Sequence, residues 1–494
     1  MKKQRSVKFN AIMNILLTSS TMFLSVVTIP YVTRTLSVEG YGNVNFAQSI
    51  SSWLSALCLV GVPSYAVREC ARVRDDPIAL VRVVKEMLII ISLFTAIVLG
   101  AFGICIIFVP RLSSLASLMW VFLISTLILS YGVEWYFQAV EQYEYIAIRS
   151  IVFKILAFIA ILFFVRDSED WFFYGVILAL VTCGNNLFNL MRLLKEIPLS
   201  TKTSINPWKH FKSLSSYAIL SIASAIYMSF DSVLLGMLNE NNVQVALYQL
   251  AAKIKGLCWS VVNSIVGVLI PRLSYYAKNN FDKFDGLAQR GFYFLLNICF
   301  GLMFYLLVFS EPLVVLVSSN KYSSATIPVQ IIGIVNLLSC MSYFLSLCIL
   351  SPLDRERKIA EANIIGVPIS LVLNLCLDGK FGAIGAALSI LAAEAVIFIR
   401  QAYASRDVLG RILQPAKIFR VVLAHIVAFA VILILSFVLE QAGIDYLATG
   451  TAAIAVVSGA IAYAFAWLIS ALLLHEETAT WVIGMIRGIF RRIR

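Results

Sequence analysis

The chain has 494 residues, of which 60% are hydrophobic and only 13% charged, and its mean hydropathy is +0.89. Soluble domains are about 45–50% apolar and about 25% charged, so this composition excludes an ordinary soluble protein. A helix of about 20 apolar residues crosses a bilayer core of about 30 Å, and continuous apolar runs of this length recur along the chain. The runs do not alternate with a period of two, which excludes a membrane β-barrel. We therefore expect an all-α polytopic membrane protein.

The apolar runs predict fourteen transmembrane helices. We expect the first six at residues 10–33, 43–66, 80–108, 113–136, 147–166 and 170–193. Six more follow at residues 213–237, 244–270, 287–317, 325–350, 359–378 and 381–404. A last pair is expected at residues 417–440 and 447–473. No connection between these helices is long enough for a soluble catalytic domain, and we expect no enzyme activity.

The basic residues predict the orientation of these helices. If the N-terminus is cytoplasmic, the cytoplasmic connections and the two chain ends hold most of the 39 Lys and Arg residues. The opposite connections carry only Arg34, Arg111, Arg166, Lys321 and Lys380. Because an excess of Lys and Arg marks the cytoplasmic side, we expect both termini in the cytoplasm. The formal net charge of +12 is then a consequence of topology, and no nucleic-acid partner is needed.

The longest connection predicts a division into two lobes. It covers residues 195–212 and separates the six helices of residues 1–194 from the six of residues 213–405. A unit with an even number of helices re-enters the membrane from the same side, so a repeat of this kind is parallel. We expect two parallel six-helix lobes, then a helix pair in residues 406–474 and a basic amphipathic cytoplasmic tail in residues 475–494.

Lys253 is the strongest candidate for a substrate-binding residue. A charge at mid-membrane costs about 2.5–3.5 kcal/mol on insertion scales, so it calls for a functional explanation. On a period of 3.6 residues, Lys253 shares a helix face with small and polar residues: Gly256, Ser260, Asn263, Ser264 and Gly267. Lys255 lies about 200° away, on an apolar face. We expect Lys253 to face an aqueous cavity; the alternative is a helix-packing face from which Lys253 reaches to the membrane surface.

Three other charged residues are candidates for gating or coupling. Arg34 and Asp231 both lie towards the outer surface and could form an ion pair there, although two separate interfacial charges are the simpler interpretation. Glu394 lies in the middle of its predicted helix. It could carry a coupling proton, or it could only hydrogen-bond to a neighbouring helix.

Three amides in the first two predicted helices are further candidates: Asn14, Asn45 and Gln48. Amide side chains can bind sugar hydroxyls, and they also join helices within a membrane. The sequence does not separate these two roles.

The sequence contains no motif for metal or nucleotide chemistry. The nine cysteines show no paired spacing, and there are only three histidines, so neither a disulfide framework nor a metal site is predicted. No Walker A pattern is present, so ATP is not expected to drive the protein directly. We expect no cofactor, and a proton or sodium gradient is the candidate driving force.

Two stretches of the sequence resemble a known family. The first contains Pro30-Tyr31, Arg34-Thr35-Leu36, Glu39-Gly40-Tyr41-Gly42 and Phe46-Ala47. The second contains Glu134-Trp135-Tyr136-Phe137-Gln138, followed by Lys154. Together they are similar to the Wzx-type oligosaccharide flippases, the polysaccharide-transporter branch of the superfamily that includes the MATE exporters. Further on, the chain resembles the second half of that family at Asp231 and at Tyr248 with Ala252-Lys253-Ile254.

The resemblance implies a MATE-like fold and a lipid-linked glycan as cargo. It implies alternating access that moves polyprenyl-diphosphate-linked oligosaccharide from the inner to the outer leaflet of a bacterial cytoplasmic membrane. The product would be O-antigen, capsule or exopolysaccharide, with a glycan polymerase and glycosyltransferases as candidate partners. We expect substrate binding by Lys253, Arg34, Asn14, Asn45, Gln48 and Lys154. We expect coupling or gating by Asp231, Glu394 and Glu134.

Other functions remain open at this point. A lipid II flippase would share the fold, and fourteen helices are typical of that group, whereas many Wzx-type members have twelve. A MATE-type exporter of cations would need carboxylates in its cleft, and this chain offers few. A membrane glycosyltransferase or glycan polymerase would need a long outer loop with acidic and basic residues, which the sequence lacks. The chain also has Ala139 where the Wzx-type family usually has glycine.

Overall fold

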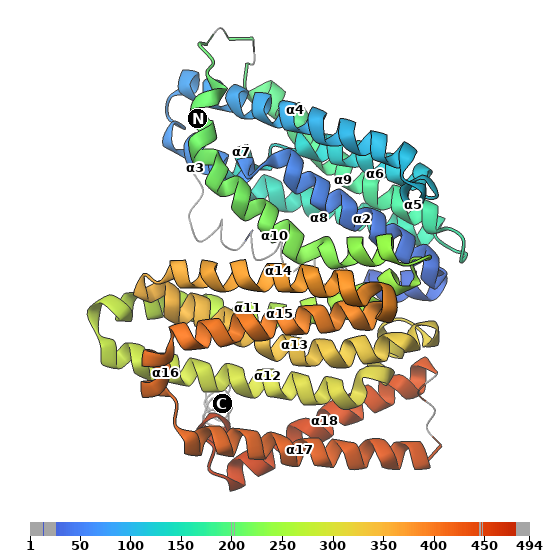
Figure 1. Ribbon diagram of the computed structural model, residues 1–494, viewed down its shortest axis with the longest axis vertical. Coiled ribbons are helices and arrows are strands. Elements are labelled where there is room, and N and C mark those ends of the chain that lie inside the picture. The colour runs from blue at the N-terminus through green and yellow to red at the C-terminus, as the bar shows by residue number, and fades with distance from the viewer. Residues whose placement is uncertain are drawn as a thin grey trace, which may run out of the picture. The chain divides into compact units, whose positions relative to one another are not determined.

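The computed structural model describes residues 13, 26–198, 200–201, 203–443, 446 and 448–480, and only the backbone of residues 226–228. Every regular element within these ranges is a helix (Figure 1). The chain divides into two compact units, Met1–Ala246 and Leu247–Arg494. Each unit contains its own core of buried apolar side chains.

The first unit is a bundle of apolar helices around α2. After the helical residues 26–35, its elements are α2 (Val38–Leu59), α3 (Val62–Arg72), α4 (Pro77–Phe108), α5 (Pro110–Ser113), α6 (Ala116–Ser130), α7 (Glu134–Ala139), α8 (Tyr143–Phe164), α9 (Trp171–Glu196), η1 (Pro207–His210) and α10 (Phe211–Leu238). Ser37 and Asp76 start α2 and α4, because their side chains accept backbone N–H groups of the first turn. Helix α2 packs against α4, α6, α9 and α10.

Two glycines allow close backbone contacts within the first unit. A Cβ atom at Gly42 would lie 1.9 Å from the carbonyl oxygen of Asn242, and one at Gly61 would lie 2.4 Å from the backbone of Tyr217 in α10. Gly61 also has a φ of +72°, which glycine adopts without strain. Gly61 lies in the break between α2 and α3, and these two helices are bent by 41° relative to each other.

The second unit is a bundle in which α13 is the most buried membrane-spanning helix. Its elements are α11 (Val243–Asn279), α12 (Phe281–Val317), η2 (Asn320–Ala325), α13 (Thr326–Phe344), η3 (Leu345–Leu350), η4 (Ser351–Leu353), α14 (Glu356–Phe381), α15 (Ala383–Ala404), α16 (Arg406–Ile412), α17 (Pro415–Gln441) and α18 (Thr449–Leu473). Helix α13 packs between α12 and α15, and α14 forms a hairpin with α15. Helices α17 and α18 pack on each other and on α12.

A buried polar network joins α17 and α18 to α12. Nδ1 of His425 lies 2.7 Å from the hydroxyl of Tyr463, and its Nε2 lies 3.2 Å from Oδ1 of Asn297. Trp467 donates its Nε1–H to the same oxygen at 3.1 Å. The amide of Asn297 also donates to Glu476, beyond the end of α18, at 3.4 Å. Because unpaired polar groups are costly in an apolar interior, this network fixes the register of the helix pair on α12.

A bidentate ion pair holds α16 to the start of α14. The guanidinium of Arg355 donates to both carboxylate oxygens of Asp407, each at 2.8 Å. The hydrogen bonds from Arg355 are the main cause that holds the pKa of Asp407 at about 2. The pair therefore keeps Asp407 ionised throughout the physiological pH range.

The prediction of a polytopic membrane protein is confirmed. Eleven described helices are long and apolar enough to cross a membrane, and the number reaches thirteen if two bent helix pairs count as one span each. The bent pairs are α2 with α3, and Pro207–Ala225 with Ser229–Leu238, where the bend is 54°. The predicted first helix, at residues 10–33, lies mostly outside the described residues. The count of fourteen therefore stays a prediction.

Several predicted helix boundaries differ from the structure by a few residues, and two helix ends differ most. The helix expected at residues 244–270 continues through Pro271 to Asn279. Proline removes one backbone hydrogen bond, but membrane helices tolerate it where neighbouring groups satisfy the freed carbonyl. The helix expected at residues 43–66 ends at Leu59, where Gly61 allows the break before α3.

The division into units lies one helix beyond the predicted linker at residues 195–212. Helix α10 packs on α2 and α3, so it belongs to the first unit. The predicted lobes at residues 1–194 and 213–405, with the helix pair 406–474 and the tail 475–494, stay predictions. Residues 481–494 of that tail lie outside the described residues.

Candidate functional site

Helix α11 has one buried apolar face and one open polar face. Val262 and Val266 are completely buried. Asn263 and Ser264 are exposed, and a Cβ atom at Gly267 would meet no atom within 4 Å. Lys253 lies half-buried near the start of the same helix. Its role as a substrate-binding residue stays a prediction, and the geometry leaves the polar face of α11 available to a ligand.

Lys255 and Glu394 form an ion pair within the second unit. Nζ of Lys255 in α11 lies 3.9 Å from Oε1 of Glu394 in α15, and the two side chains are 19% and 6% exposed. The helical period places Lys255 on another face than Lys253, which stays a prediction, and it gives no sign of this partner on another helix. Because Glu394 lies beside a cation, its carboxylate is partly neutralised in place. Its predicted coupling role stays untested.

Arg34 and Asp231, the predicted gating residues, differ in their surroundings. Arg34 is exposed at the end of the helical residues 26–35, and Asp231 in α10 is buried. Both belong to the first unit, and a gating pair between them stays a prediction.

The predicted amide residues also differ from one another. The side chain of Asn45 is buried and donates to the carbonyl oxygen of Tyr41, one turn earlier in α2, at 2.7 Å. Its amide N–H is therefore satisfied by its own helix. Gln48 is exposed on α2, which leaves its amide accessible. Asn14 lies outside the described residues.

Glu134 belongs to a cluster built around an arginine that the sequence analysis did not single out. The guanidinium of Arg149 in α8 is 6% exposed and lies 3.2 Å from Glu134, whose side chain is 39% exposed. Nε of Arg149 donates to Oδ1 of Asn185 in α9 at 2.6 Å. Lys154 lies half-buried one turn further along α8. In the sequence, Arg149 interrupts an apolar run, and this position could have identified it as a candidate functional residue.

Arg111 in α5, just after the end of α4, binds the last turn of α10 and the residues that follow it. Its guanidinium donates to the carbonyl oxygens of Gly236 and Glu240 at 2.7 and 2.8 Å, and to Oδ1 of Asn242 at 2.8 Å. The amide of Asn242 in turn donates to Asn43 in α2 at 2.7 Å. From the sequence, Arg111 is only one of the few basic residues in the predicted outer connections.

A second buried carboxylate fixes the connection before α10. The side chain of Glu86 in α4 is completely buried, and its oxygens lie 2.9 Å from Nζ of Lys209 and 2.8 Å from Nε2 of His210. The backbone N–H of Asn206 donates to it at 2.8 Å. The other ring nitrogen of His210 lies 2.7 Å from the hydroxyl of Tyr65 in α3. These contacts fix one end of α10 against α3 and α4.

The polar face of α11 presents side chains that could bind a ligand through hydrogen bonds and charge. Among the described residues, no three His, Cys, Asp or Glu side chains are grouped so that they could hold a metal ion. The groups that the polar face of α11 presents are an ammonium, a hydroxyl and an amide. Such groups recognise anions and sugar hydroxyls by hydrogen bonding and charge.

Relatives of known name share most of the chain. A protein of Shigella dysenteriae whose name describes an O-antigen transporter is 25% identical over 411 residues, which cover 80% of this chain and 98% of that protein. Its namesake in Escherichia coli strain K12 is 23% identical, with 79% and 95% covered. A protein of Haloferax volcanii whose name describes a flippase of low-salt glycan biosynthesis is 22% identical over 210 residues, which cover 42% and 44% of the two chains.

Two solved structures share the fold. Lipid II flippase MurJ, in an inward closed conformation, matches with a TM-score of 0.59 and 14% identity, covering 93% of this chain and 98% of that one. An inward-facing multidrug resistance transporter of the MATE family matches with a TM-score of 0.54 and 13% identity, covering 78% and 98%. These likenesses confirm the predicted MATE-like fold. The family described as polysaccharide biosynthesis protein matches residues 7–277, more than half of the chain. This protein therefore belongs to the polysaccharide biosynthesis protein family.

Proposed function

We propose that this protein is a flippase for lipid-linked oligosaccharide. It moves polyprenyl-diphosphate-linked repeat units from the inner to the outer leaflet of the cytoplasmic membrane, for the assembly of O-antigen, capsule or exopolysaccharide. The observation that carries the proposal is the similarity, over 80% of this chain, to a protein named for O-antigen transport. The relative named for a glycan flippase supports the same class of cargo.

In this proposal, Lys253 binds the diphosphate of the cargo. A phosphate oxygen accepts stronger hydrogen bonds from a charged donor than from a neutral one. On the same helix, the exposed Asn263 has an oxygen that accepts from Tyr343 at 2.7 Å, so it offers its amide N–H groups to sugar hydroxyls. The exposed Ser264 donates to the carbonyl oxygen of Ser260 at 2.8 Å, so it offers its hydroxyl oxygen as an acceptor. The polyprenyl tail stays in the bilayer throughout. Alternating access then moves the cargo without making or breaking a covalent bond, so we propose no enzyme activity and no cofactor.

The remaining predicted residues take supporting roles in the proposal. Substrate contacts come from Arg34, Asn14, Asn45, Gln48 and Lys154. Gating or coupling to a proton or sodium gradient involves Asp231, Glu394 and Glu134. A glycan polymerase and glycosyltransferases are the proposed partners, because they make and consume the cargo.

The pairing of Glu394 argues against export of cationic drugs. Among the predicted helices, Glu394 is the acidic residue in the middle of a helix that could bind a cation. Its carboxylate lies 3.9 Å from the ammonium of Lys255 and is almost completely buried. A cationic drug would have to displace Lys255 from this carboxylate.

A complementation experiment tests the proposal. Deleting the gene should leave lipid-linked oligosaccharide on the cytoplasmic leaflet and remove the glycan from the cell surface. Lys253→Ala should fail to restore surface glycan at normal membrane abundance, and Lys253→Arg should restore it in part, because it keeps the charge but changes the shape. Lys278→Ala, an exposed lysine near the end of α11, is the matched control and should restore it fully.

Three results would contradict the proposal. Full restoration by Lys253→Ala would remove Lys253 from the cargo site. Intact surface glycan in the deletion strain, together with increased sensitivity to cationic dyes, would indicate a drug exporter instead. Loss of lipid II transport with intact surface glycan would indicate a lipid II flippase.

We also propose that both termini lie in the cytoplasm. Single cysteines at Asn241 and Lys321, in a background without other cysteines, should then react with an impermeant thiol reagent added outside intact cells. Cysteines at Lys278 and Arg357 should react only after the membrane is opened. Labelling in the opposite sense would reverse the orientation.

A further inference from the structure

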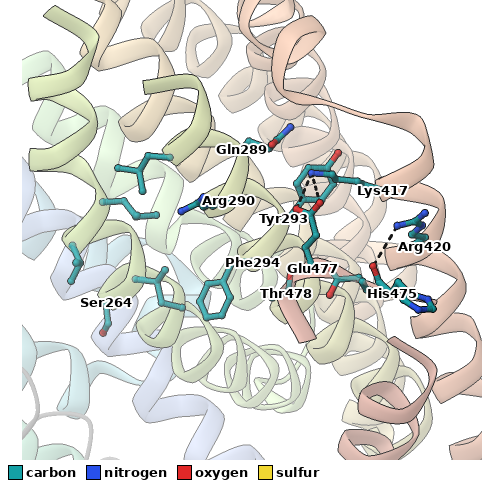
Figure 2. Close-up of a pocket in the computed structure, with 16 residues that line it drawn as sticks. Ser264, Gln289, Arg290, Tyr293, Phe294, Lys417, Arg420, His475, Glu477 and Thr478 are labelled. Atoms are coloured by element: carbon teal, nitrogen blue, oxygen red, sulfur yellow. Dashed lines mark hydrogen bonds and ion pairs between the residues drawn. The ribbon is translucent and has the colours of Figure 1, made fainter. Parts of the chain in front are cut away.

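A cavity of about 810 Å³ lies in the second unit, between α11, α12, the start of α17 and the residues that follow α18 (Figure 2). Pockets that bind small molecules typically measure about 300–1,000 Å³. The walls of this cavity are mainly apolar, with side chains from Ile265, Val268, Leu269, Leu287 and Phe294. A hydrocarbon chain would be compatible with such walls.

Three basic side chains line the cavity beside these apolar walls. Figure 2 shows Arg290 on one side and Lys417 and Arg420 on the other. Arg290 is exposed, and among the described residues it has no hydrogen bond or ion pair. Arg420 is also exposed and makes a single long hydrogen bond of 3.4 Å, to the carbonyl oxygen of His475. Both guanidinium groups can therefore donate hydrogen bonds to an anionic ligand.

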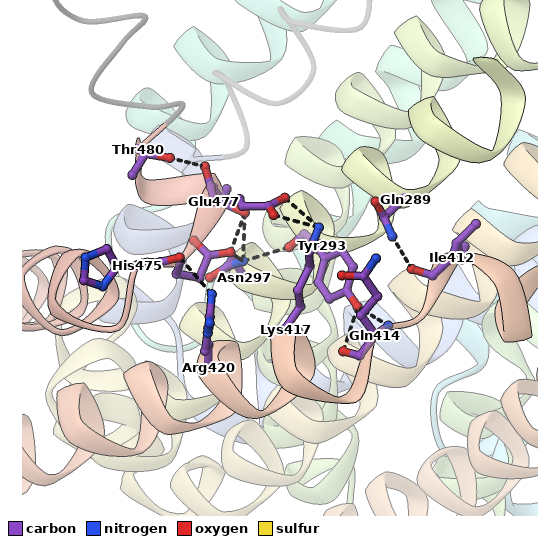
Figure 3. Close-up of polar contacts among 12 residues, drawn as sticks. Gln289, Tyr293, Asn297, Ile412, Gln414, Lys417, Arg420, His475, Glu477 and Thr480 are labelled. Atoms are coloured by element: carbon purple, nitrogen blue, oxygen red, sulfur yellow. Dashed lines mark hydrogen bonds and ion pairs between the residues drawn. The ribbon is translucent and has the colours of Figure 1, made fainter. Parts of the chain in front are cut away.

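The acidic residues of the cavity are already engaged. Glu477 forms an ion pair with Lys417, with 2.7 Å between Nζ and Oε1 (Figure 3). Glu476 is buried and accepts hydrogen bonds from the hydroxyl of Thr478 and the backbone N–H of Ala479. Three basic and two acidic side chains line the cavity, so its net charge stays positive, and among the described residues the two arginines form no ion pair.

Hydrogen bonds across the cavity wall hold its shape. The amide of Gln289 donates to the carbonyl oxygen of Ile412 at 2.6 Å, and the hydroxyl of Tyr293 accepts the backbone N–H of Gln414 at 2.9 Å (Figure 3). These contacts tie the connection between α16 and α17 to α12. The cavity is thus preformed and does not depend on a ligand to assemble it.

The cavity lies at the ends of its helices. Helix α12 begins at Phe281, α17 begins at Pro415 and α18 ends at Leu473, and all three ends are cytoplasmic in the proposed orientation. Basic pockets between membrane helices on this side bind the head groups of anionic lipids. Apolar walls beside two available arginines match an amphiphile that has a phosphate and a hydrocarbon chain.

We propose that this cavity binds an anionic phospholipid of the cytoplasmic leaflet. Its phosphate is attracted by Arg290 and Arg420, which line opposite sides of the cavity, and an acyl chain extends along Val268 and Phe294. The site shares Ser264 with the polar face of α11 but does not include Lys253, and it does not rest on the identity of the transported cargo.

The test uses the purified full chain in detergent and counts bound lipid by native mass spectrometry. Phosphatidylglycerol should bind at one molecule per chain, and phosphatidylcholine should not. The double variant Arg290→Gln/Arg420→Gln should weaken phosphatidylglycerol binding about 30-fold, because it removes two basic residues near the membrane surface. Arg272→Gln/Arg357→Gln removes the same charge from exposed residues of the same unit outside the cavity, and it should bind like the wild type.

Four results would overturn the proposal. Equal binding by the two double variants would exclude the cavity as the site. Equal binding of phosphatidylcholine would remove the role of the anionic head group. Displacement of the lipid by inorganic phosphate would indicate a site for soluble anions, and displacement by an equal concentration of polyprenyl phosphate would assign the cavity to the cargo. The melting temperature without added lipid checks that both double variants are folded.

Discussion

Lys255 and Glu394 should be more costly to separate than to remove together. The two charged atoms lie 3.9 Å apart, and both side chains are largely buried. At an effective dielectric constant near 20, opposite charges at this distance attract by about 4 kcal/mol, and burial of both groups offsets part of that gain. Removing one partner of a buried pair costs about 3–5 kcal/mol, because the other charge stays buried and unpaired.

We expect Lys255→Met and Glu394→Gln each to lower the free energy of unfolding by about 3 kcal/mol. This is the low end of that range, because Lys255 is partly exposed. The double variant should lose only about as much as one single variant, which gives a coupling energy near 3 kcal/mol. Unfolding in mixed micelles titrated with SDS measures all four proteins. Lys321→Met and Glu311→Gln, both exposed in the same unit, are the control pair and should show no coupling. Losses of the Lys255 and Glu394 variants that simply add would refute the reasoning.

Three further predictions concern packing and pH. Glu86→Ala should lower the free energy of unfolding by about 2–4 kcal/mol, because it leaves buried donors without their acceptor. Glu141→Ala, in a pair that is about one-third exposed, should lower it by at most about 1 kcal/mol. Unfolding in micelles titrated with SDS compares the two variants, and equal losses would contradict this prediction. Gly42→Ala should strongly reduce the amount of protein in the membrane, because its Cβ would lie 1.9 Å from a carbonyl oxygen. Gly256→Ala, whose Cβ meets no atom within 4 Å, should be tolerated. An immunoblot of membranes measures the amount of each variant, and equal amounts would contradict this prediction. The pKa of Asp407 is about 2, below about 3.9 in an unfolded chain, so the stabilisation by its ion pair is complete above about pH 4 and is lost as the pH falls through about 2. The difference in melting temperature between wild type and Asp407→Asn should shrink over that pH range. A constant difference would contradict this linkage between pKa and stability.

The sequence predicts the helices well because each crosses an apolar solvent. A run of about 20 apolar residues has few alternatives to a membrane helix, since every backbone group must be hydrogen-bonded within the segment. Composition predicts less well where a helix ends. The local sequence around Pro271 resembles a helix end, yet α11 continues past it, and at Gly61 a close contact with α10 accompanies a break inside an apolar run.

The partners of the charged residues depend on helices that are far apart in the sequence. The helical period can assign Lys253 and Lys255 to different faces, because both lie on one helix. It cannot find Glu394 opposite Lys255, or Asn185 opposite Arg149, because these contacts depend on which helices pack together. Arg111 shows the same limit, since its three acceptors lie in the last turn of α10 and just after it, more than a hundred residues along the chain.

The helix pair α17–α18 bears on the choice between glycan and lipid II transport. Fourteen helices alone would favour a lipid II flippase, but the pair is joined to α12 by the network around Asn297 and His425. Nearly the whole of the O-antigen transporter relative is matched by 80% of this chain, so similarity to that relative does not require every helix of this chain. Because α17 and the residues after α18 complete the basic cavity, we interpret the pair as part of a lipid-binding site, and the pair does not by itself indicate a different cargo.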